Sequence, residues 1–118
     1  MRGASENQTE TPYKKARLSI QDTLDVVGGK WKLVLIFVLI DGKKRFNQLS
    51  REVGISPRIL SKELQELEMN GLISRTVCHT KPVTVDYALT DYSKTLSDVV
   101  TTMCKWGERH REKIVGSD

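Results

Sequence analysis

The sequence predicts a mainly α-helical domain with one small β-hairpin, and three consecutive patterns carry this prediction. A helix over about residues 56–70 has capping residues at both ends. Immediately before it, apolar residues three and four positions apart predict a shorter helix over 45–53. After it, the segments 72–77 and 83–89 have strand character. Two helices joined by a short turn and followed by a hairpin form a winged helix-turn-helix domain, with the wing over about residues 72–89.

Length and composition agree with this fold. A chain of 118 residues is long enough for one domain with a modest core. Its 38% hydrophobic and 29% charged residues are ordinary for a soluble globular protein. The net charge of +4 is compatible with nucleic-acid binding, although many basic proteins bind nothing anionic. The apolar run 33–40 is far shorter than the ~20 residues of a membrane span, so we expect no membrane partner and a cytoplasmic protein.

The N-terminal residues 1–17 are polar and contain almost no apolar side chains. They predict a flexible arm rather than a signal peptide, because a signal peptide needs an apolar segment of roughly 7–15 residues. Lys14, Lys15 and Arg17 could contact phosphates, although solvating the arm is the simpler interpretation. We therefore expect the folded domain, with helices for dimerisation at both ends, to span residues 18–114.

Two helices are expected between the arm and the helix-turn-helix. Ile20, Leu24 and Val27 recur at helical spacing and predict a short helix that ends at the following glycine pair. The next segment, 30–41, is ambiguous, because its β-branched residues favour a buried strand and its periodicity cannot decide. Gly42 as a helix stop, and the position just before a helix-turn-helix, favour a buried helix, which is our prediction.

The helix over 56–70 has strong end signals. Ser56 can accept a hydrogen bond from a free amide in the first turn. Pro57 suits the first helical position, where no amide hydrogen is needed. Gly71 can adopt the left-handed conformation just beyond the last turn.

The two faces of this helix differ in chemistry. Leu60, Leu64 and Leu67 form one narrow apolar stripe that predicts burial. The opposite side carries residues that can hydrogen-bond base edges or phosphates in a major groove. These outward residues are Arg58, Ser61, Lys62 and Gln65, with Met69 on the same side. The pattern is that of a recognition helix presenting its basic N-terminal half to DNA.

Further cations flank the helix-turn-helix and the wing. Three of them lie at the entrance to the helix over 45–53, where they oppose the helix dipole unless a phosphate or an acid compensates. In the wing, Val83, Val85, Tyr87 and Leu89 alternate on one face, and the 78–82 loop would approach the minor groove or the backbone. The candidate DNA contacts are Lys43, Lys44, Arg45, Ser56, Arg58, Ser61, Lys62, Gln65, Arg75 and Lys81.

A last long helix is expected over about residues 91–113. Thr90 can cap it, and Asp91 is well placed in its first turn. Its apolar side is about six turns long and wider than a small domain needs, so we expect part of it to contact a second subunit. The alternative is a helix that folds entirely onto its own domain. The candidate dimer-interface residues are Ile20, Leu24, Leu96, Val99, Val100, Met103, Trp106 and His110.

The sequence offers little catalytic or metal chemistry. No nucleophile, base and orienting group can be assembled from its motifs, so we expect a protein that is not an enzyme and uses no cofactor. Cys78 and His79 lack the second ligand pair that a zinc site requires, so no metal is expected. Cys104 is expected to be a small buried packing residue, with a redox or inter-subunit role as the alternative.

Several motifs in order resemble the HxlR-type winged helix-turn-helix regulators. They occupy residues 23–32, 44–49, 55–60, 64–68, 70–75, 85–90 and 104–107, and the resemblance covers roughly 18 to 110. It implies a bacterial or archaeal dimeric transcription factor whose first and last helices pair across a two-fold axis. It also implies that 30–41 is helical.

One departure from the family pattern concerns a sensor residue. Many relatives carry a redox- or electrophile-sensing cysteine in a Cys-Pro-Val context just ahead of the first helix. The corresponding position here is Leu18, followed by Ser19 and Ile20. The resemblance therefore implies that thiol sensing at this position is not open to the chain.

These observations predict a homodimeric transcriptional regulator that binds a pseudo-palindromic double-stranded operator. The alternative is a protein-interaction module in which the winged helix no longer binds DNA. A small-molecule effector would refine the first prediction. Trp31, Met103 and Trp106 could line an apolar pocket near the dimer interface, although core packing explains them without a ligand.

Overall fold

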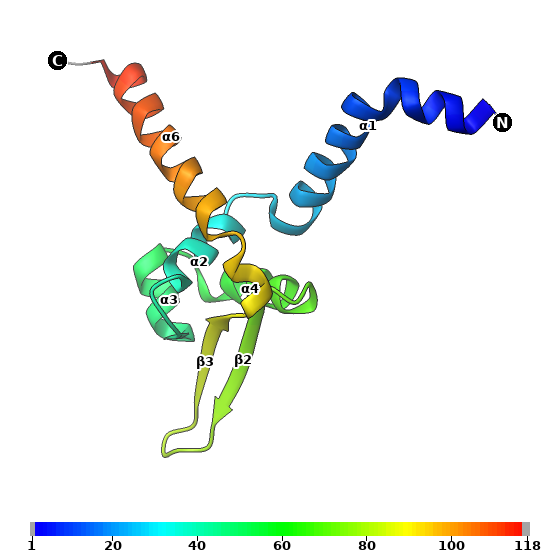
Figure 1. The fold of residues 1–118 in the computed structure, drawn as a ribbon. Helices are drawn as coiled ribbons and strands as arrows, with labels where there is room; N and C mark the ends of the chain where they lie inside the picture. The colour runs from blue at the N-terminus through cyan, green and yellow to red at the C-terminus, as the bar shows by residue number, and fades with distance from the viewer. Residues whose placement is uncertain (1, 117–118) are drawn as a thin grey trace.

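The computed structural model describes residues 2–116, with residues 2–10 described by their backbone alone. In chain order the elements are α1 (Arg2–Val27), α2 (Lys32–Leu39), β1 (Lys44–Arg45), α3 (Phe46–Val53), α4 (Pro57–Met69), β2 (Ile73–Cys78), β3 (Thr84–Leu89), α5 (Asp91–Lys94) and α6 (Ser97–Val115). The β2–β3 hairpin extends from one side of the body, and α1 and α6 extend from the opposite side (Figure 1). The predicted mainly α-helical winged helix-turn-helix is confirmed.

The N-terminal segment differs from the prediction. Residues 2–17, which we expected to form a flexible polar arm, are the first part of α1, which runs continuously from Arg2 to Val27. Absence of apolar residues says little about helicity here, since Glu, Gln, Lys, Arg and Ala all have high helix propensity. Pro12 lies inside α1, and the helix changes direction within its N-terminal half (Figure 1). The helix ends at Val27, just before the glycine pair, as predicted.

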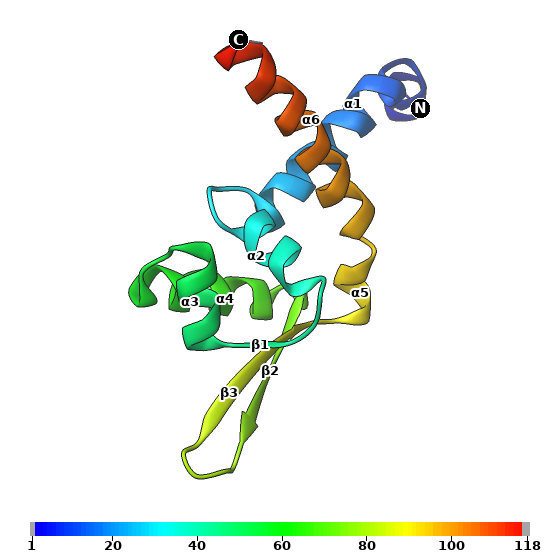
Figure 2. The ribbon, with the colours of Figure 1, turned by 90° about the vertical axis from the view of Figure 1, so that its left-hand side faces the viewer.

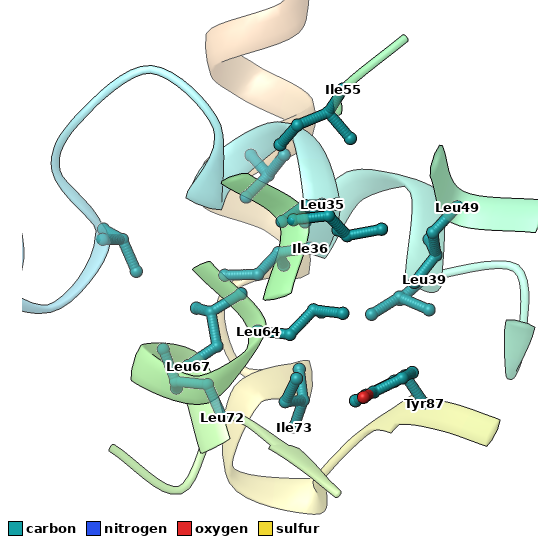
Figure 3. Close-up of a cluster of buried hydrophobic side chains, with 13 residues drawn as sticks. Leu35, Ile36, Leu39, Leu49, Ile55, Leu64, Leu67, Leu72, Ile73 and Tyr87 are labelled. Carbon is teal, nitrogen blue, oxygen red and sulfur yellow. The ribbon is translucent and has the colours of Figure 1, made fainter. Parts of the chain in front are cut away.

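The segment with ambiguous periodicity is helical. Within α2, Leu35 and Ile36 have no exposed surface and Leu39 is 2% exposed. These side chains meet Leu64 of α4 and Tyr87 of β3 in the centre of the domain (Figure 3). The core therefore forms where α2 crosses the helix-turn-helix, and the predicted buried helix is confirmed.

The turn between α3 and α4 follows its sequence signals. Gly54 ends α3 in the left-handed conformation, with φ 75°. The Ser56 hydroxyl accepts a hydrogen bond from the Ile59 amide at 3.3 Å, and Pro57 is the first residue of α4. Gly71 has φ 73° just beyond the helix. Local side-chain and backbone chemistry thus sets both ends of α4.

The sheet contains one strand more than the sequence predicts. The strand order is β1-β3-β2, and both pairs are antiparallel. In this register Asp86 of β3 lies opposite Arg45 of β1 on one side and Thr76 of β2 on the other. A strand of two residues is too short to produce a periodic pattern, which is why β1 has no signal of its own.

The C-terminal helix is broken, which corrects the prediction of one continuous helix over 91–113. Thr90 caps α5 by accepting a hydrogen bond from the Ser93 amide at 3.2 Å, as predicted. The Thr95 hydroxyl donates to the Tyr92 carbonyl at 2.6 Å, and helix α6 then begins at Ser97 in a new direction (Figure 2). Hydroxyl groups that bond nearby backbone atoms compete with helical hydrogen bonds, and this accounts for the break.

Candidate nucleic-acid interface

The outward face of α4 is polar, basic and open to solvent. Leu60, Leu64 and Leu67 are at most 1% exposed and anchor the helix to the core. The opposite side chains are all exposed, namely Arg58, Ser61, Lys62 and Gln65. They can therefore reach base edges or phosphates without any rearrangement of the core. Ser56 is also exposed, but its hydroxyl serves as the helix cap.

A hollow next to α4 brings two wing residues to this face. Ser61, Gln65 and Glu68 of α4 line it together with Arg75 of β2 and Tyr87 of β3. The exposed Arg75 guanidinium thus shares a concave surface with two of the outward α4 residues. Lys81, by contrast, is exposed in the loop between β2 and β3. This loop is the end of the hairpin that lies away from the body of the domain (Figure 1).

The cations before α3 lie in two different environments. Lys43 Nζ is 3.8 Å from Asp86 Oδ2, and Arg45 Nε is 3.9 Å from Asp86 Oδ1. The side chains of Lys43 and Arg45 are 72% and 67% exposed, so their cationic groups remain open to a phosphate. Lys44 is only 18% exposed and pairs with Glu52 of α3 at 3.3 Å. Its position fits an internal link between β1 and α3 better than a DNA contact.

A groove runs between the start of α3 and the wing. Arg45 and Asn47 line one side of it, and Pro82 and Thr84 line the other. Arg51 of α3 also lines the groove, and sequence inspection did not single it out. Gln48 donates a hydrogen bond to Glu52, and this bond, with the nearby Lys44, lowers the pKa of the Glu52 carboxyl.

A buried ion pair beneath α4 was missed from the sequence. Lys32 of α2 is 8% exposed, and its Nζ lies 2.8 Å from Glu63 Oε1 and 2.6 Å from Glu66 Oε1. Burial lowers the pKa of the Lys32 ammonium, but the hydrogen bonds and charges of the two glutamates outweigh burial and raise it. The signal available was a lysine at the start of an apolar helix and two acids three positions apart. The single positive charge of Lys32 is thus shared between two acids on the helix that carries the basic face.

The proposed dimerisation face is mostly exposed. Ile20 and Leu24 of α1 are 60% and 57% exposed, and Met103 and Trp106 of α6 are 51% and 59% exposed. Val99 is likewise exposed, and His110 stacks on the Trp106 ring with centroids 4.9 Å apart. Two residues differ: Leu96 is half-buried, and Val100 is 5% exposed within the chain's own core. The assignment of Val100 to an interface is therefore wrong, because α6 turns it toward α2.

Core packing, the favoured interpretation of Trp31, Met103 and Trp106, holds for Trp31 alone, and the three side chains do not form the alternative apolar pocket. Trp31 packs against the core, with Lys30 Nζ 4.9 Å from its ring centroid. Trp106 stacks on His110 instead. Met103 lines an apolar groove between α2 and α6, together with Phe37 and Cys104.

Neither cysteine forms a metal site in this structure. Cys104 is exposed, which corrects the expectation of a buried packing residue. Cys78 is half-buried, and its thiol donates to Asp86 Oδ2 at 3.5 Å. Within the part of the chain that the structure describes, no three His, Cys, Asp or Glu side chains gather into a possible metal site.

No helix among residues 2–116 has the length and apolar character needed to cross a membrane.

Comparison with known proteins agrees with this architecture. Residues 26–115 match the HxlR-like helix-turn-helix family. The uncharacterized HTH-type transcriptional regulator YybR of Bacillus subtilis (strain 168) is 43% identical over 111 residues, which cover 93% of this chain and 88% of YybR. YdeP, described in the same words and from the same strain, is 44% identical over 80% of this chain and 75% of its own length. The redox regulator HypR, in its oxidized form, superposes with a TM-score of 0.74 and 46% identity, over 77% of this chain and 95% of HypR.

The fold and the basic face of α4 define a helix-turn-helix transcriptional regulator of the winged type. YybR and YdeP are both described as HTH-type transcriptional regulators, and the matches cover 88% and 75% of their lengths. The chain belongs to the HxlR-like helix-turn-helix family.

Proposed function

We propose that this regulator is a homodimer that binds a pseudo-palindromic operator, with α4 of each protomer in a major groove. The observation that carries the proposal is the separation of the two faces of α4. The leucines of one face are buried, and the four polar or basic residues of the other face are all exposed. Arg58 is the strongest candidate for reading a base, since arginine binds guanine through two hydrogen bonds.

The neighbouring cations would hold the DNA backbone. Lys43 and Arg45 are mostly exposed beside α3, and Arg75 lies in the hollow beside α4. Lys81 in the wing loop would approach the minor groove or the adjacent phosphates. Such contacts add affinity without sequence information and make binding sensitive to salt. Lys44 is left out of this set because Glu52 already pairs with it.

Dimerisation would use α1 and α6. Both helices extend from the side of the domain opposite to the wing, and each carries exposed apolar residues (Figure 1). Exposed apolar surface of this extent is a mark of an interaction site. Two-fold symmetry then predicts half-sites about one helical turn, ~34–36 Å, or a multiple of it apart.

The test is salt-dependent binding to the DNA that flanks the protein's own gene, measured against a scrambled duplex by fluorescence anisotropy. We expect selective binding that Arg58→Ala weakens by the ~1–3 kcal/mol of a bidentate base contact. Arg109→Ala on α6 is the control, because it removes the same charge from an exposed residue far along the chain from α4. We expect it to leave the ratio of specific to scrambled binding unchanged.

If the flanking DNA is not bound selectively, the next step is to select genomic fragments that bind the wild-type protein. If neither the flanking DNA nor any genomic fragment is enriched, the winged helix does not bind a sequence and the protein-interaction alternative replaces this proposal. If a fragment is enriched, Arg58→Ala is tested on that fragment.

A further inference from the structure

A small cavity lies where the C-terminal half of α1 meets the junction between α5 and α6. Its volume is about 220 Å³. Val26 and Val27 of α1 line it together with Leu72, which follows α4, and Leu96, which precedes α6. Val27 and Leu72 belong to the core, so one wall of the cavity is fixed to the body of the domain. We propose that this cavity binds a small amine, an ammonium group on a compact apolar body.

The polar groups of the cavity favour a hydrogen-bond donor that carries a positive charge. Asp22 of α1 contributes a carboxylate to the lining. The Thr23 hydroxyl donates to the Ser19 carbonyl at 2.8 Å, and the Thr95 hydroxyl donates to the Tyr92 carbonyl at 2.6 Å. Because both hydroxyl hydrogens are engaged, the two threonine oxygens can offer a ligand only lone pairs, as acceptors. An ammonium group, which has three donors and no acceptor, complements this set.

The volume of the cavity and the aromatic ring in its lining restrict the kind of ligand further. Pockets for drug-sized ligands measure ~300–1,000 Å³, so a cavity of 220 Å³ suits a smaller molecule such as a single ring with a short amine. Tyr92 is 69% exposed where it lines the cavity. Its ring can attract a cation from solvent. A carboxylate ligand would instead meet the charge of Asp22.

The position of the cavity gives the ligand a regulatory consequence. Helical geometry puts Asp22 and Val26 on a different side of α1 from Ile20 and Leu24, so a ligand beside them leaves these two proposed dimerisation residues free. Leu96, a third proposed dimerisation residue, lines the cavity itself. A ligand held between α1 and the α5–α6 junction would fix the angle of α1 to the body. In the dimer proposed above, that angle sets the separation of the two recognition helices. This regulatory step rests on the proposed function, whereas amine binding does not.

The experiment is a ¹⁵N–¹H NMR titration of the full chain with benzylamine, benzyl alcohol and benzoate. We expect benzylamine to bind tightest and benzoate weakest, with shifts centred on Val26, Leu72 and Leu96. Asp22→Asn should weaken benzylamine binding by about fivefold, the upper end of an exposed ion pair, and leave benzyl alcohol unchanged. Asp25→Asn is the control, because it removes the same charge three residues along α1 and outside the lining.

Three results would overturn the site. They are equal binding of benzylamine and benzyl alcohol, equal weakening by the two asparagine variants, and shifts that lie away from the cavity. These titrations contain no DNA, so their result does not depend on whether the protein binds an operator. In a second arm, benzylamine should change the operator affinity of the wild type but not of Asp22→Asn. An amine that binds in the cavity without changing operator affinity would overturn the regulatory step alone.

Discussion

The Nζ atom of Lys32 lies 2.8 Å from Oε1 of Glu63, so an ion pair joins the start of α2 to the middle of α4. The same ammonium group binds Glu66 at 2.6 Å. Lys32 directly follows the segment that leads in from α1, and α4 is the helix that we propose reads DNA. The Lys32 side chain therefore links α4 to the segment that follows α1, one of the two proposed dimerisation helices.

Removing the ammonium group should destabilise the fold. Lys32→Ala leaves the Glu63 carboxylate, whose side chain is 13% exposed, without its partner. Breaking a buried pair from one side costs about 3 kcal/mol, and chemical denaturation would measure this loss. Lys62→Ala removes the same charge from an exposed side chain of α4 and should change stability by less than about 0.5 kcal/mol. Similar losses in the two variants would contradict the role of Lys32.

The double variant Lys32→Met with Glu63→Gln separates pairing from packing. A methionine fills similar space, and the glutamine leaves no buried charge. Replacing a buried pair by neutral groups is often close to neutral. We therefore expect the double variant to recover most of the stability lost in Lys32→Ala. If it is as unstable as the single variant, lost packing rather than the unpaired carboxylate explains the effect.

The same ion pairs predict a pH dependence of stability with a defined sign. The hydrogen bond from Lys32 lowers the pKa of the Glu66 carboxyl, so its stabilisation is present above the unfolded pKa of about 4.3 and is lost as pH falls through the folded pKa. Burial opposes the charge of Lys32, but its glutamate partners raise its pKa overall. Its stabilisation is therefore complete below about pH 10.4 and is lost as pH rises through the folded pKa.

The measurement is the free energy of unfolding of the wild type and of Lys32→Met across the pH range. The difference between the two proteins should stay constant between about pH 6 and pH 9 and shrink toward both extremes. Total stability will also change with other groups, which is why the difference is the relevant quantity. A difference that is constant at every pH would show that these pairs do not couple protonation to folding.

Local chemistry made much of the fold predictable from sequence. Ser56, Pro57 and Gly71 fix the ends of α4 through contacts within a few residues, and each acts as predicted. The break after α5 was not predictable from apolar periodicity, because the stripe continues through it. It depends on the hydrogen bond from the Thr95 hydroxyl to the Tyr92 carbonyl, and threonine does not form such a bond in every helix.

The site was less predictable because it depends on pairing between distant segments. Lys32 and Glu63 are 31 residues apart, and only the crossing of α2 and α4 brings them together. Likewise, Lys44 and Arg45 are adjacent in sequence, yet one binds Glu52 and the other faces Asp86. These two residues form β1, and adjacent residues of a strand point to opposite faces of the sheet. A strand of two residues has no sequence signal, so this difference could not be predicted.

The Asp86 carboxylate should act on DNA binding through the cations that it holds. Its side chain is 15% exposed and lies within 4 Å of both Lys43 Nζ, at 3.8 Å, and Arg45 Nε, at 3.9 Å. If only net charge mattered, Asp86→Asn would strengthen binding to every DNA equally. The carboxylate also orients the two cations, and phosphate contacts fix the register in which the recognition helix meets the bases. We therefore expect the ratio of operator to scrambled affinity to fall by about twofold to fivefold, the range of exposed ion pairs.

Binding of Asp86→Asn to both duplexes at one salt concentration measures this ratio. Glu108→Gln on α6 is the matched control, because it removes one negative charge from an exposed residue outside the interface. We expect the control to change both affinities alike. If Asp86→Asn leaves the ratio of operator to scrambled affinity unchanged, Asp86 acts on DNA binding through its charge alone.

A single charge on the apolar side of α6 should separate the proposed dimer without unfolding the protomer. Met103 is 51% exposed and lies on the same side of the helix as Val99 and Trp106. Met103→Glu would bury an unpaired carboxylate at a two-fold interface, once from each protomer, which is strongly unfavourable. Since the side chain is half open in the protomer, the free energy of unfolding should change little.

Sedimentation velocity at micromolar concentration gives the oligomeric state directly. We expect the wild type to sediment as a dimer and Met103→Glu as a monomer, with weaker binding to a two-site operator. Lys105→Glu places the same carboxylate at an exposed position with no proposed interface residue three or four positions away on α6, so it should remain dimeric. A dimeric Met103→Glu would move the interface away from α6, and a monomeric wild type would remove it altogether.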